Sequence, residues 1–343
     1  MSGIAAIIHF DGGPVDNAAI QRMTEAMIYR GPDGTNHFLS GSAALGACMM
    51  HTSAEEQVAS EPCSNEDASI SLVLDGYVAN HAELRRELLQ RGAHLRNCSD
   101  AELVLRALET WGKDCARNID GEFAFIAWDA RTRSLHCARD HAGLRPLFYY
   151  RREDLLVMAS DFAAIRKGAR IELEPNPEVL VQIAANQHYF TDQTVWRVIR
   201  RVMPAHGMRF DRSGQREWRY WHLPERYSIR HASDDEYAEH YREVLSESVR
   251  QASRTDRTLA VEVSGGLDSS AVFASADQLY RNARLQAPQI AGFALEGPRD
   301  SPADELRFTQ AVEEHLSIPI HRQPLHIPPF DRLLAQAQRD ADI

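Results

Sequence analysis

The feature of this sequence that most restricts its fold is the run Ser264-Gly265-Gly266-Leu267-Asp268-Ser269-Ser270. It follows the apolar stretch 259–263 and precedes a helical pattern, so we expect a strand, a tight turn and a helix. Glycines at 265 and 266 let backbone N–H groups approach a phosphate without a Cβ atom in the way, and the helix directs its positive end toward the anion. The run therefore predicts a pyrophosphate-binding loop.

Within this loop, Asp268 is the candidate Mg²⁺ ligand, and the hydroxyls of Ser264, Ser269 and Ser270 are candidate donors to phosphate. The Walker A pattern G-x-x-x-x-G-K-[ST] is absent, which indicates a different phosphate chemistry. The run resembles the motif of the PP-loop ATP pyrophosphatases. That family cleaves ATP between the α and β phosphates and attaches AMP to a carboxylate or a similar oxygen. A glycine-rich turn with a serine cap is the simpler alternative.

Length and composition indicate a folded protein with two domains. A chain of 343 residues, 25% of them charged, is long enough for two separate cores and is not typical of disorder. The net charge of −11 gives no broad cationic surface for nucleic acid or anionic lipid. The five cysteines lack C-x-x-C spacing, and no apolar window is long enough to span a membrane. We therefore expect reduced thiols and a cytoplasmic location.

The first region, residues 1–224, has the pattern of a layered α+β domain. An apolar strand begins at Gly3, and further strands are expected at 43–50, at 70–74 and between residues 121 and 159. Two helices are predicted to begin with capping boxes, formed by Asn80 with Glu83 and by Ser99 with Glu102. Strands, two helices and more strands predict helices packed on sheets, with the N-terminus inside a sheet. Between residues 172 and 224 the signals weaken.

The second region, residues 233–343, has the pattern of a parallel sheet. Ser233 and Glu236 predict a capping box at the start of a long helix. The phosphate-loop strand, a helix to about Tyr280, a strand at 290–295 and a helix at about 304–316 follow. This β-loop-α-β-α order is typical of the start of a doubly wound α/β domain.

Taken together, the order of motifs resembles the asparagine synthetase B family. Its members join an N-terminal glutaminase-type domain of the Ntn-hydrolase fold (αββα) to a PP-loop synthetase domain. Besides the phosphate loop, the resemblance rests on Met1–Ala5, Arg30–Asp33, Asp75–Asn80, Ser99–Glu102, Asp120–Phe125 and Arg139–Leu147. It implies ATP and Mg²⁺ as cofactors.

The resemblance also implies two nucleotide contacts through the backbone, at Glu262 and at Leu295. For Leu295, a place in the core of the sheet is an equal alternative. For Asp304 and Glu305 we favour a role in starting a helix over a catalytic role, because carboxylates stabilise helix N-termini.

The chain departs from the family in the glutaminase site. The nucleophile, a cysteine in the family, corresponds to Ser2, and a hydroxyl is a weaker nucleophile than a thiol near neutral pH. Asp75 stands where the family has the asparagine of the oxyanion hole, and a carboxylate there repels a developing oxyanion. Met49 stands near the position of the arginine that binds the glutamine carboxylate. These three losses predict a domain that no longer hydrolyses glutamine.

Part of the glutamine pocket is retained. Gly76 matches the family, and Asp100 matches the residue that would hold the glutamine ammonium. Asp100 also follows Ser99 at the predicted start of a helix, where a carboxylate is favoured in any case.

Without ammonia, the nucleophile is expected to be an amine on the substrate itself. This resembles the β-lactam synthetases and the lasso-peptide cyclases, and the stretch 49–55 favours the cyclases. Such an enzyme would close a macrolactam on a precursor peptide, with a leader-peptide-binding protein and a protease as partners. A glutamine-hydrolysing asparagine synthetase that uses serine, and a non-catalytic module that binds a peptide or protein, are the alternatives. In relatives an acidic second loop follows the position of Ile343, so we expect a fragment or an incomplete domain.

Overall fold

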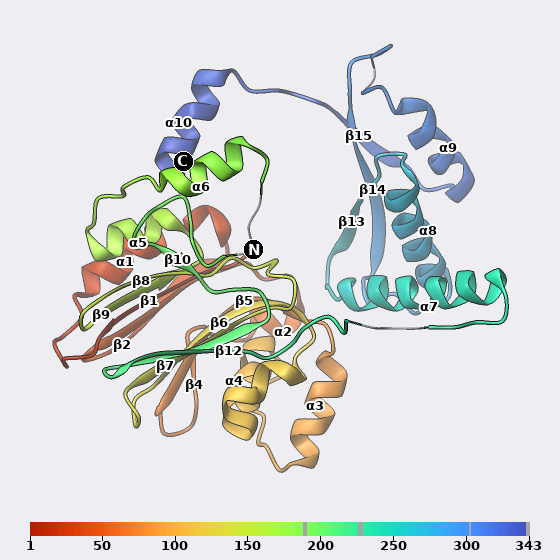
Figure 1. The fold of residues 1–343 in the computed structure, drawn as a ribbon. Helices are drawn as coiled ribbons and strands as arrows, with labels where there is room; N and C mark the ends of the chain where they lie inside the picture. The colour runs from red at the N-terminus through yellow and green to blue at the C-terminus, as the bar shows by residue number, and fades with distance from the viewer. Residues whose placement is uncertain (188–190, 226–228, 302, 341–343) are drawn as a thin grey trace. The chain divides into compact units, whose positions relative to one another are not determined.

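The computed structural model describes residues 1–187, 191–225, 229–301 and 303–340. They form two compact units, each described by itself (Figure 1). The first contains residues 1–51, 55–223 and the segment from Phe330 onward, and the second contains residues 52–54 and 224–329. Within the described residues, no helix combines the length and the apolar character needed to span a membrane.

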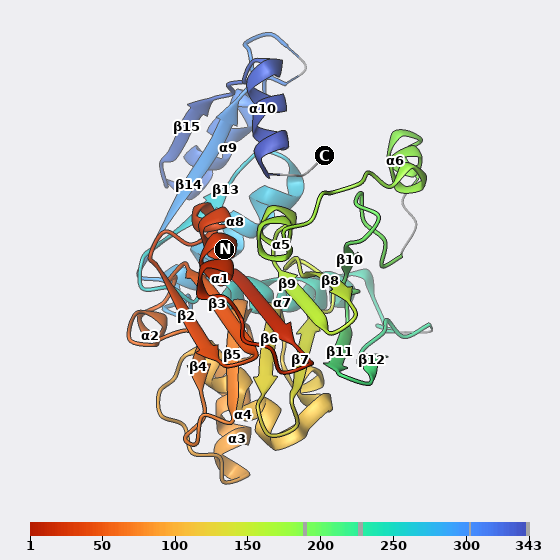
Figure 2. The ribbon, with the colours of Figure 1, turned by 90° about the vertical axis from the view of Figure 1, so that its left-hand side faces the viewer.

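The first unit is built on two six-stranded antiparallel sheets (Figures 1 and 2). One sheet has the strand order β10-β8-β9-β1-β3-β2, and the other has the order β12-β11-β7-β6-β5-β4. The strands of the first sheet are β1 (Gly3–His9), β2 (Gly34–Ser40), β3 (Ala43–Met49), β8 (Phe148–Arg152), β9 (Leu155–Ala159) and β10 (Arg200–Arg201). Those of the second are β4 (Cys63–Ser64), β5 (Ile70–Val78), β6 (Gly121–Asp129), β7 (Ser134–Arg139), β11 (His206–Asp211) and β12 (Gly214–Arg219).

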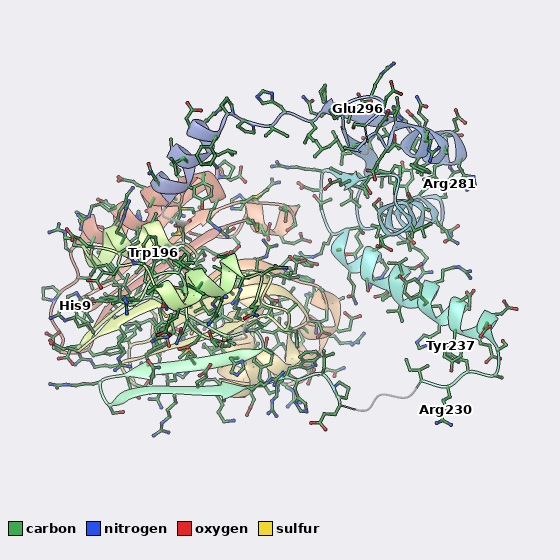
Figure 3. All side chains as sticks on the ribbon, turned by 45° about the horizontal axis from the view of Figure 1, so that its top comes forward. His9, Trp196, Arg230, Tyr237, Arg281 and Glu296 are labelled. Carbon is green, nitrogen blue, oxygen red and sulfur yellow. The ribbon has the colours of Figure 1, made fainter. Side chains whose placement is uncertain are left out.

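Helices cover the outer faces of the two sheets. The helical segments are α1 (Asn17–Ala26), η1 (Ile28–Arg30), α2 (Ala54–Gln57), α3 (His81–Gln90), α4 (Asp100–Trp111), η2 (Gly112–Asn118), α5 (Phe162–Ala169), α6 (Pro177–Ala184) and α10 (Phe330–Asp340). The inner faces of the sheets share one core, to which Ile4 and Ile126 belong. Helices α1 and α5 complete a second core that includes Trp196 (Figure 3), and α3 and α4 complete a third around Leu84 and Leu105. The expected αββα order of layers is confirmed.

Strand β1 places the start of the chain in the interior of a sheet. It pairs with β3 on one side and with β9 on the other. Both faces of β1 are covered, and residues 3–8 are all buried, which explains why this segment is a continuous apolar run. Ser2 is consequently held at one end of the sandwich.

The second unit contains a three-stranded parallel sheet with the order β13-β14-β15, as expected for the start of an α/β domain. Its strands are β13 (Thr258–Glu262), β14 (Gln289–Glu296) and β15 (Ile320–Pro324), and its helices are α7 (Asp234–Ala252), α8 (Leu267–Arg281) and α9 (Leu306–Leu316). Val263, Phe273 and Ile320 belong to its core. Figure 3 labels Glu296 at the end of β14 and Arg281 at the end of α8.

Two of the three predicted helix caps are present. Ser99 accepts a hydrogen bond from the Glu102 N–H at 3.2 Å, and Ser233 accepts one from the Glu236 N–H at 3.3 Å. The predicted cap at Asn80 is wrong, since its side chain makes no bond to the helix. It binds the Asp120 N–H and the Asn118 carbonyl instead, so a contact distant in sequence replaces the local one.

Candidate functional site

The loop between β13 and α8 has the geometry of an anion-binding site. Gly266 precedes the helix with an extended backbone, and no side chain caps the helix through it. Gly265 has a φ of +81°, and a Cβ atom there would lie 2.6 Å from the Cβ of Phe308. Glycine is therefore required at 265, and the first N–H groups of α8 are accessible to a phosphate.

The loop serines hold the loop in shape. The hydroxyls of Ser264 and Ser269 lie 2.9 Å apart. Ser269 Oγ accepts a hydrogen bond from the Ser264 N–H at 3.1 Å, and Ser264 Oγ accepts one from the Gly266 N–H at 3.3 Å. The hydroxyl of Ser270 is buried and has no hydrogen-bond partner among the described residues. A buried hydroxyl without a partner fits a site whose acceptor is a ligand oxygen.

The other predicted nucleotide contacts lie near the loop at the same end of the sheet. Asp268 is exposed in the first turn of α8, and Glu262 is exposed at the end of β13. Leu295 on β14 is 56% exposed, so its alternative place in the sheet core is wrong. The Asp304 carboxylate accepts hydrogen bonds from the N–H groups of Asp300 and Leu306 at the start of α9, as favoured from the sequence, whereas the side chain of Glu305 makes no cap bond.

The described residues contain no cluster of three or more histidine, cysteine, aspartate or glutamate side chains placed to hold a metal ion. Asp268 alone would thus need phosphate oxygens or water to complete an Mg²⁺ site. This fits the habit of Mg²⁺ of binding one or two carboxylates together with substrate phosphates.

In the first unit, Asp75 lies in a buried ion-pair cluster. Its side chain is fully buried, and Oδ2 lies 3.2 Å from the Arg30 Nη2, which donates a hydrogen bond to it. Oδ1 lies 4.0 Å from the Arg145 Nη1, and Arg145 also pairs with Glu122 at 3.1 Å. Burial raises the pKa of Asp75, and the two guanidinium groups oppose this rise. The Asp75 carboxylate thus forms ion pairs with two arginines.

Ser2 is fixed by the same cluster and by the end of β3. The Arg30 Nε donates to the Ser2 carbonyl oxygen at 3.1 Å, and the Met50 N–H donates to the Ser2 hydroxyl at 3.2 Å. The Ser2 hydroxyl therefore accepts a backbone hydrogen bond, and these two contacts fix its position at the end of β3.

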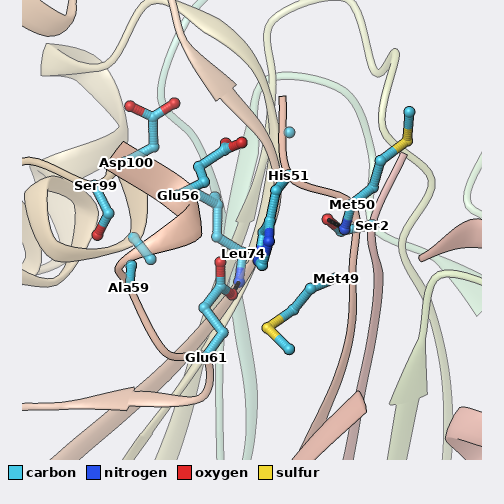
Figure 4. Close-up of a pocket in the computed structure, with 12 residues that line it drawn as sticks. Ser2, Met49, Met50, His51, Glu56, Ala59, Glu61, Leu74, Ser99 and Asp100 are labelled. Carbon is cyan, nitrogen blue, oxygen red and sulfur yellow. Dashed lines mark hydrogen bonds between the residues drawn. The ribbon is translucent and has the colours of Figure 1, made fainter. Parts of the chain in front are cut away.

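A small pocket lies behind Ser2 (Figure 4). Its free volume of about 20 Å³ is close to what one water molecule needs. Ser2, Met49, Gly76 and Asp100 are among the lining residues, and none of the lining residues is arginine or lysine. Asp75 does not line it. The structure thus brings four of the predicted positions together and directs the fifth, Asp75, into the ion-pair cluster.

Gly76 permits the close approach of β5 and β6 beside this pocket. Its φ is +127°, and a Cβ atom would lie 1.8 Å from the Glu122 carbonyl oxygen. Asp100 is buried at the start of α4, and its Oδ2 accepts a hydrogen bond from the Val78 N–H at 2.9 Å. Asp100 therefore ties α4 to β5 as well as lining the pocket.

Sequence reasoning missed three residues of this site: Arg30, Arg145 and Glu61. Arg30 and Arg145 lie in motifs that carried the family resemblance, but their pairing with Asp75 depends on the fold. Glu61 lines the pocket, and its Oε2 accepts a hydrogen bond from the Leu74 N–H at 2.7 Å. No local pattern around Glu61 indicated this role.

Comparisons with known proteins agree on the two parts of the chain. Residues 1–221 match the model of the glutamine amidotransferase domain, and residues 240–328 match that of asparagine synthase. Asparagine synthetase [glutamine-hydrolyzing] 3 of Bacillus subtilis is 29% identical over 80% of this chain and 45% of that protein. Amidase chyE of Penicillium rubens is 26% identical over 94% of this chain and 50% of that protein.

A solved structure of glutamine phosphoribosylpyrophosphate amidotransferase from B. subtilis, complexed with ADP and GMP, is similar with a TM-score of 0.51 and 14% identity. The match covers 95% of this chain and 91% of that one, and at this identity it supports the fold alone. The chain spans about half the length of the curated relatives described here. It belongs to the glutamine amidotransferase domain family, with an asparagine synthase region after that domain.

Proposed function

We propose that this chain is part of an ATP-dependent ligase that forms an amide without ammonia from glutamine. The carboxylate of the substrate attacks the α phosphate of ATP, which gives an acyl adenylate and releases pyrophosphate. An amine of the substrate then attacks the acyl carbon, AMP leaves, and the amine loses a proton. The single observation that carries this proposal is the burial of Asp75 between Arg30 and Arg145, where the family has an oxyanion donor.

The phosphate loop supports the ATP half of the proposal. The uncapped start of α8, the positive φ of Gly265 and the buried Ser270 hydroxyl fit a pyrophosphate group. Asp268 is the residue that would hold Mg²⁺, which would neutralise the leaving pyrophosphate. Glu262 and Leu295 would contact the nucleotide through their backbones. These assignments rest on the loop geometry and on the match to asparagine synthase.

The proposed amine belongs to the same molecule as the carboxylate, so the product is a macrolactam on a precursor peptide. A leader-peptide-binding protein and a protease would be the partners of such an enzyme. The pocket behind Ser2 supports this choice indirectly, since its lining lacks a guanidinium group for the carboxylate of glutamine and its free volume of about 20 Å³ is too small for the amino acid.

A glutamine-hydrolysing asparagine synthetase is the second candidate, because the Bacillus relative carries that name. The two candidates differ in their source of nitrogen. Steady ammonia release from glutamine that disappears in Ser2→Ala would establish the second candidate and refute the first.

The ligase proposal is tested by carboxylate-dependent exchange of labelled pyrophosphate into ATP, with the polypeptide as its gene encodes it. We expect Asp268→Ala to abolish the exchange. Glu314→Ala removes an exposed carboxylate on α9 and serves as the matched control, which should retain the exchange. If no carboxylate substrate supports exchange, the non-catalytic binding module is the better description.

A further inference from the structure

The segment from Glu55 to Glu61, here named the strap, forms one wall of the pocket behind Ser2. It contributes Glu56, Ala59 and Glu61 to the lining. In Figure 4, Glu56 and Glu61 lie between Asp100 on one side and His51 on the other. Ser2 is half-buried and lines the same pocket of about 20 Å³, so the position of the strap sets how much space lies beside Ser2.

One hydrogen bond of the Glu61 side chain ties the strap to the second sheet. Strand β4 pairs with β5 only through Cys63 and Ser64. Continuing this register would place residue 61 opposite Leu74. There the Glu61 Oε2 accepts the Leu74 N–H at 2.7 Å and replaces a bond of the ladder. A buried backbone N–H needs such a partner, so the closed strap depends on this carboxyl group.

The groups that face Glu61 make its negative charge unfavourable. Carboxyl groups approach it from three elements: Glu56 on the strap, Asp75 on β5 and Asp100 on α4. The His51 side chain lines the same pocket, the Cys63 thiol interacts with Glu61, and the N-terminal ammonium interacts with Glu56 and Asp75. Neither lysine nor arginine lines the pocket, and the two arginines nearby are paired with Asp75. Burial and the three carboxylates raise the pKa of Glu61 and the Leu74 N–H opposes the rise, which together give a pKa of about 8.

We propose that the strap is a proton-controlled gate, closed while Glu61 carries a proton and open to solvent at Ser2 once that proton is lost. The closed strap holds Glu61 with a pKa of about 8. In the open strap, a solvated glutamate has a pKa of about 4.3. Closing therefore takes up a proton, so low pH favours the closed strap. Between these two values the ratio of open to closed should rise about tenfold per pH unit, and it should level off above about pH 8.

The test measures access to position 2 as a function of pH. A Ser2→Cys variant of the full chain is alkylated with iodoacetamide, and the rate at residue 2 is read by peptide mass spectrometry, which separates it from the five native cysteines. Ser2→Cys/Glu61→Gln is measured in parallel, so that the intrinsic pH dependence of thiol alkylation cancels in the ratio of the two rates. We expect this ratio to rise at least tenfold from pH 6 to pH 8.

Two further variants make the result specific. Glu55→Gln lies on the strap outside the pocket lining and should leave the pH profile of Ser2→Cys unchanged. Glu56→Gln removes one of the repelling carboxylates and should move the upper plateau to lower pH, a result that does not require Glu61→Gln to fold. A rate ratio that is flat from pH 6 to pH 8, or a plateau that Glu56→Gln does not move, overturns the gate.

Discussion

Removing only the Arg30 side of the Arg30–Asp75 pair should cost more stability than removing both charges. In Arg30→Met the Asp75 carboxylate, 0% exposed, retains the Arg145 Nη1 at 4.0 Å as its ion-pair partner among the described residues. Breaking a buried ion pair by removing one partner typically costs about 3–5 kcal/mol, because the remaining charge is uncompensated. In Arg30→Met/Asp75→Asn the uncompensated charge is gone, so we expect a smaller loss than in Arg30→Met alone.

The pKa of Asp75 determines whether the stability loss in Arg30→Met grows or shrinks as the pH rises. Burial already raises this pKa above the value in the unfolded chain, and loss of Arg30 raises it further. A carboxyl group whose pKa is higher in the folded state stabilises the fold at low pH, and this contribution is lost as the pH rises through the folded pKa. The free energy of unfolding of Arg30→Met should therefore fall further below that of the wild type at pH 7.5 than at pH 5.

The assay uses the intrinsic fluorescence of the protein. All five tryptophans have numbers of 221 or below and lie in the first unit, so their emission during urea unfolding follows that unit. At about 2–4 °C per kcal/mol, the expected loss also lowers the Tm of the unit by about 10 °C. Arg117→Met, which removes an exposed partner of Asp114, should leave the midpoint nearly unchanged. A loss below about 1 kcal/mol in Arg30→Met, or a double variant less stable than Arg30→Met, would refute the reasoning.

Three other variants test single contacts. Gly76→Ala should prevent normal folding of the first unit, at a cost above about 3 kcal/mol in urea, because its Cβ would lie 1.8 Å from a backbone oxygen at a φ of +127°. Gly265→Ala should abolish pyrophosphate exchange without changing the urea unfolding curve measured by tryptophan fluorescence. If the variant also lowered the unfolding midpoint, the role of Gly265 would not be local to the loop. Wild-type stability should fall by about 1 kcal/mol per unit from pH 5 to pH 8, because Glu61 is ionised in the unfolded chain but keeps its proton in the fold up to a pKa of about 8. Glu61→Gln should remove this slope in urea titrations.

The phosphate loop could be predicted from the sequence because its determinants are adjacent. Gly265 and Gly266 follow an apolar strand and precede a helix, and the serine hydroxyls that bind the loop backbone lie within five residues of each other. Short-range hydrogen bonds and backbone conformations of this kind are encoded locally. The same reason explains the correct caps at Ser99 and Ser233.

The arrangement around Asp75 could not be predicted in this way. Arg30 is 45 residues away in the sequence, and its guanidinium reaches Asp75 only because the fold brings the end of the helical turn η1 close to β5. Asn80 illustrates the same limit, since a partner 40 residues away replaced its predicted cap. Residue type indicates what a side chain can bind, and the tertiary fold selects the partner.

Under the proposed function, the ion pairs predict that a single change at position 75 does not confer glutamine hydrolysis. Asp75→Asn would return an amide to the oxyanion position, but it would leave the buried guanidinium of Arg30 without its carboxylate, and Arg145 with Glu122 alone. Uncompensated buried charges are costly, so the cluster would rearrange around the new amide. The hydroxyl of Ser2 would still accept a hydrogen bond from the Met50 N–H, and the lining of the pocket would still lack an arginine or lysine to pair with the carboxylate of glutamine. Under the proposed function, glutamine hydrolysis would therefore require changes at Ser2 and Met49 as well as at position 75.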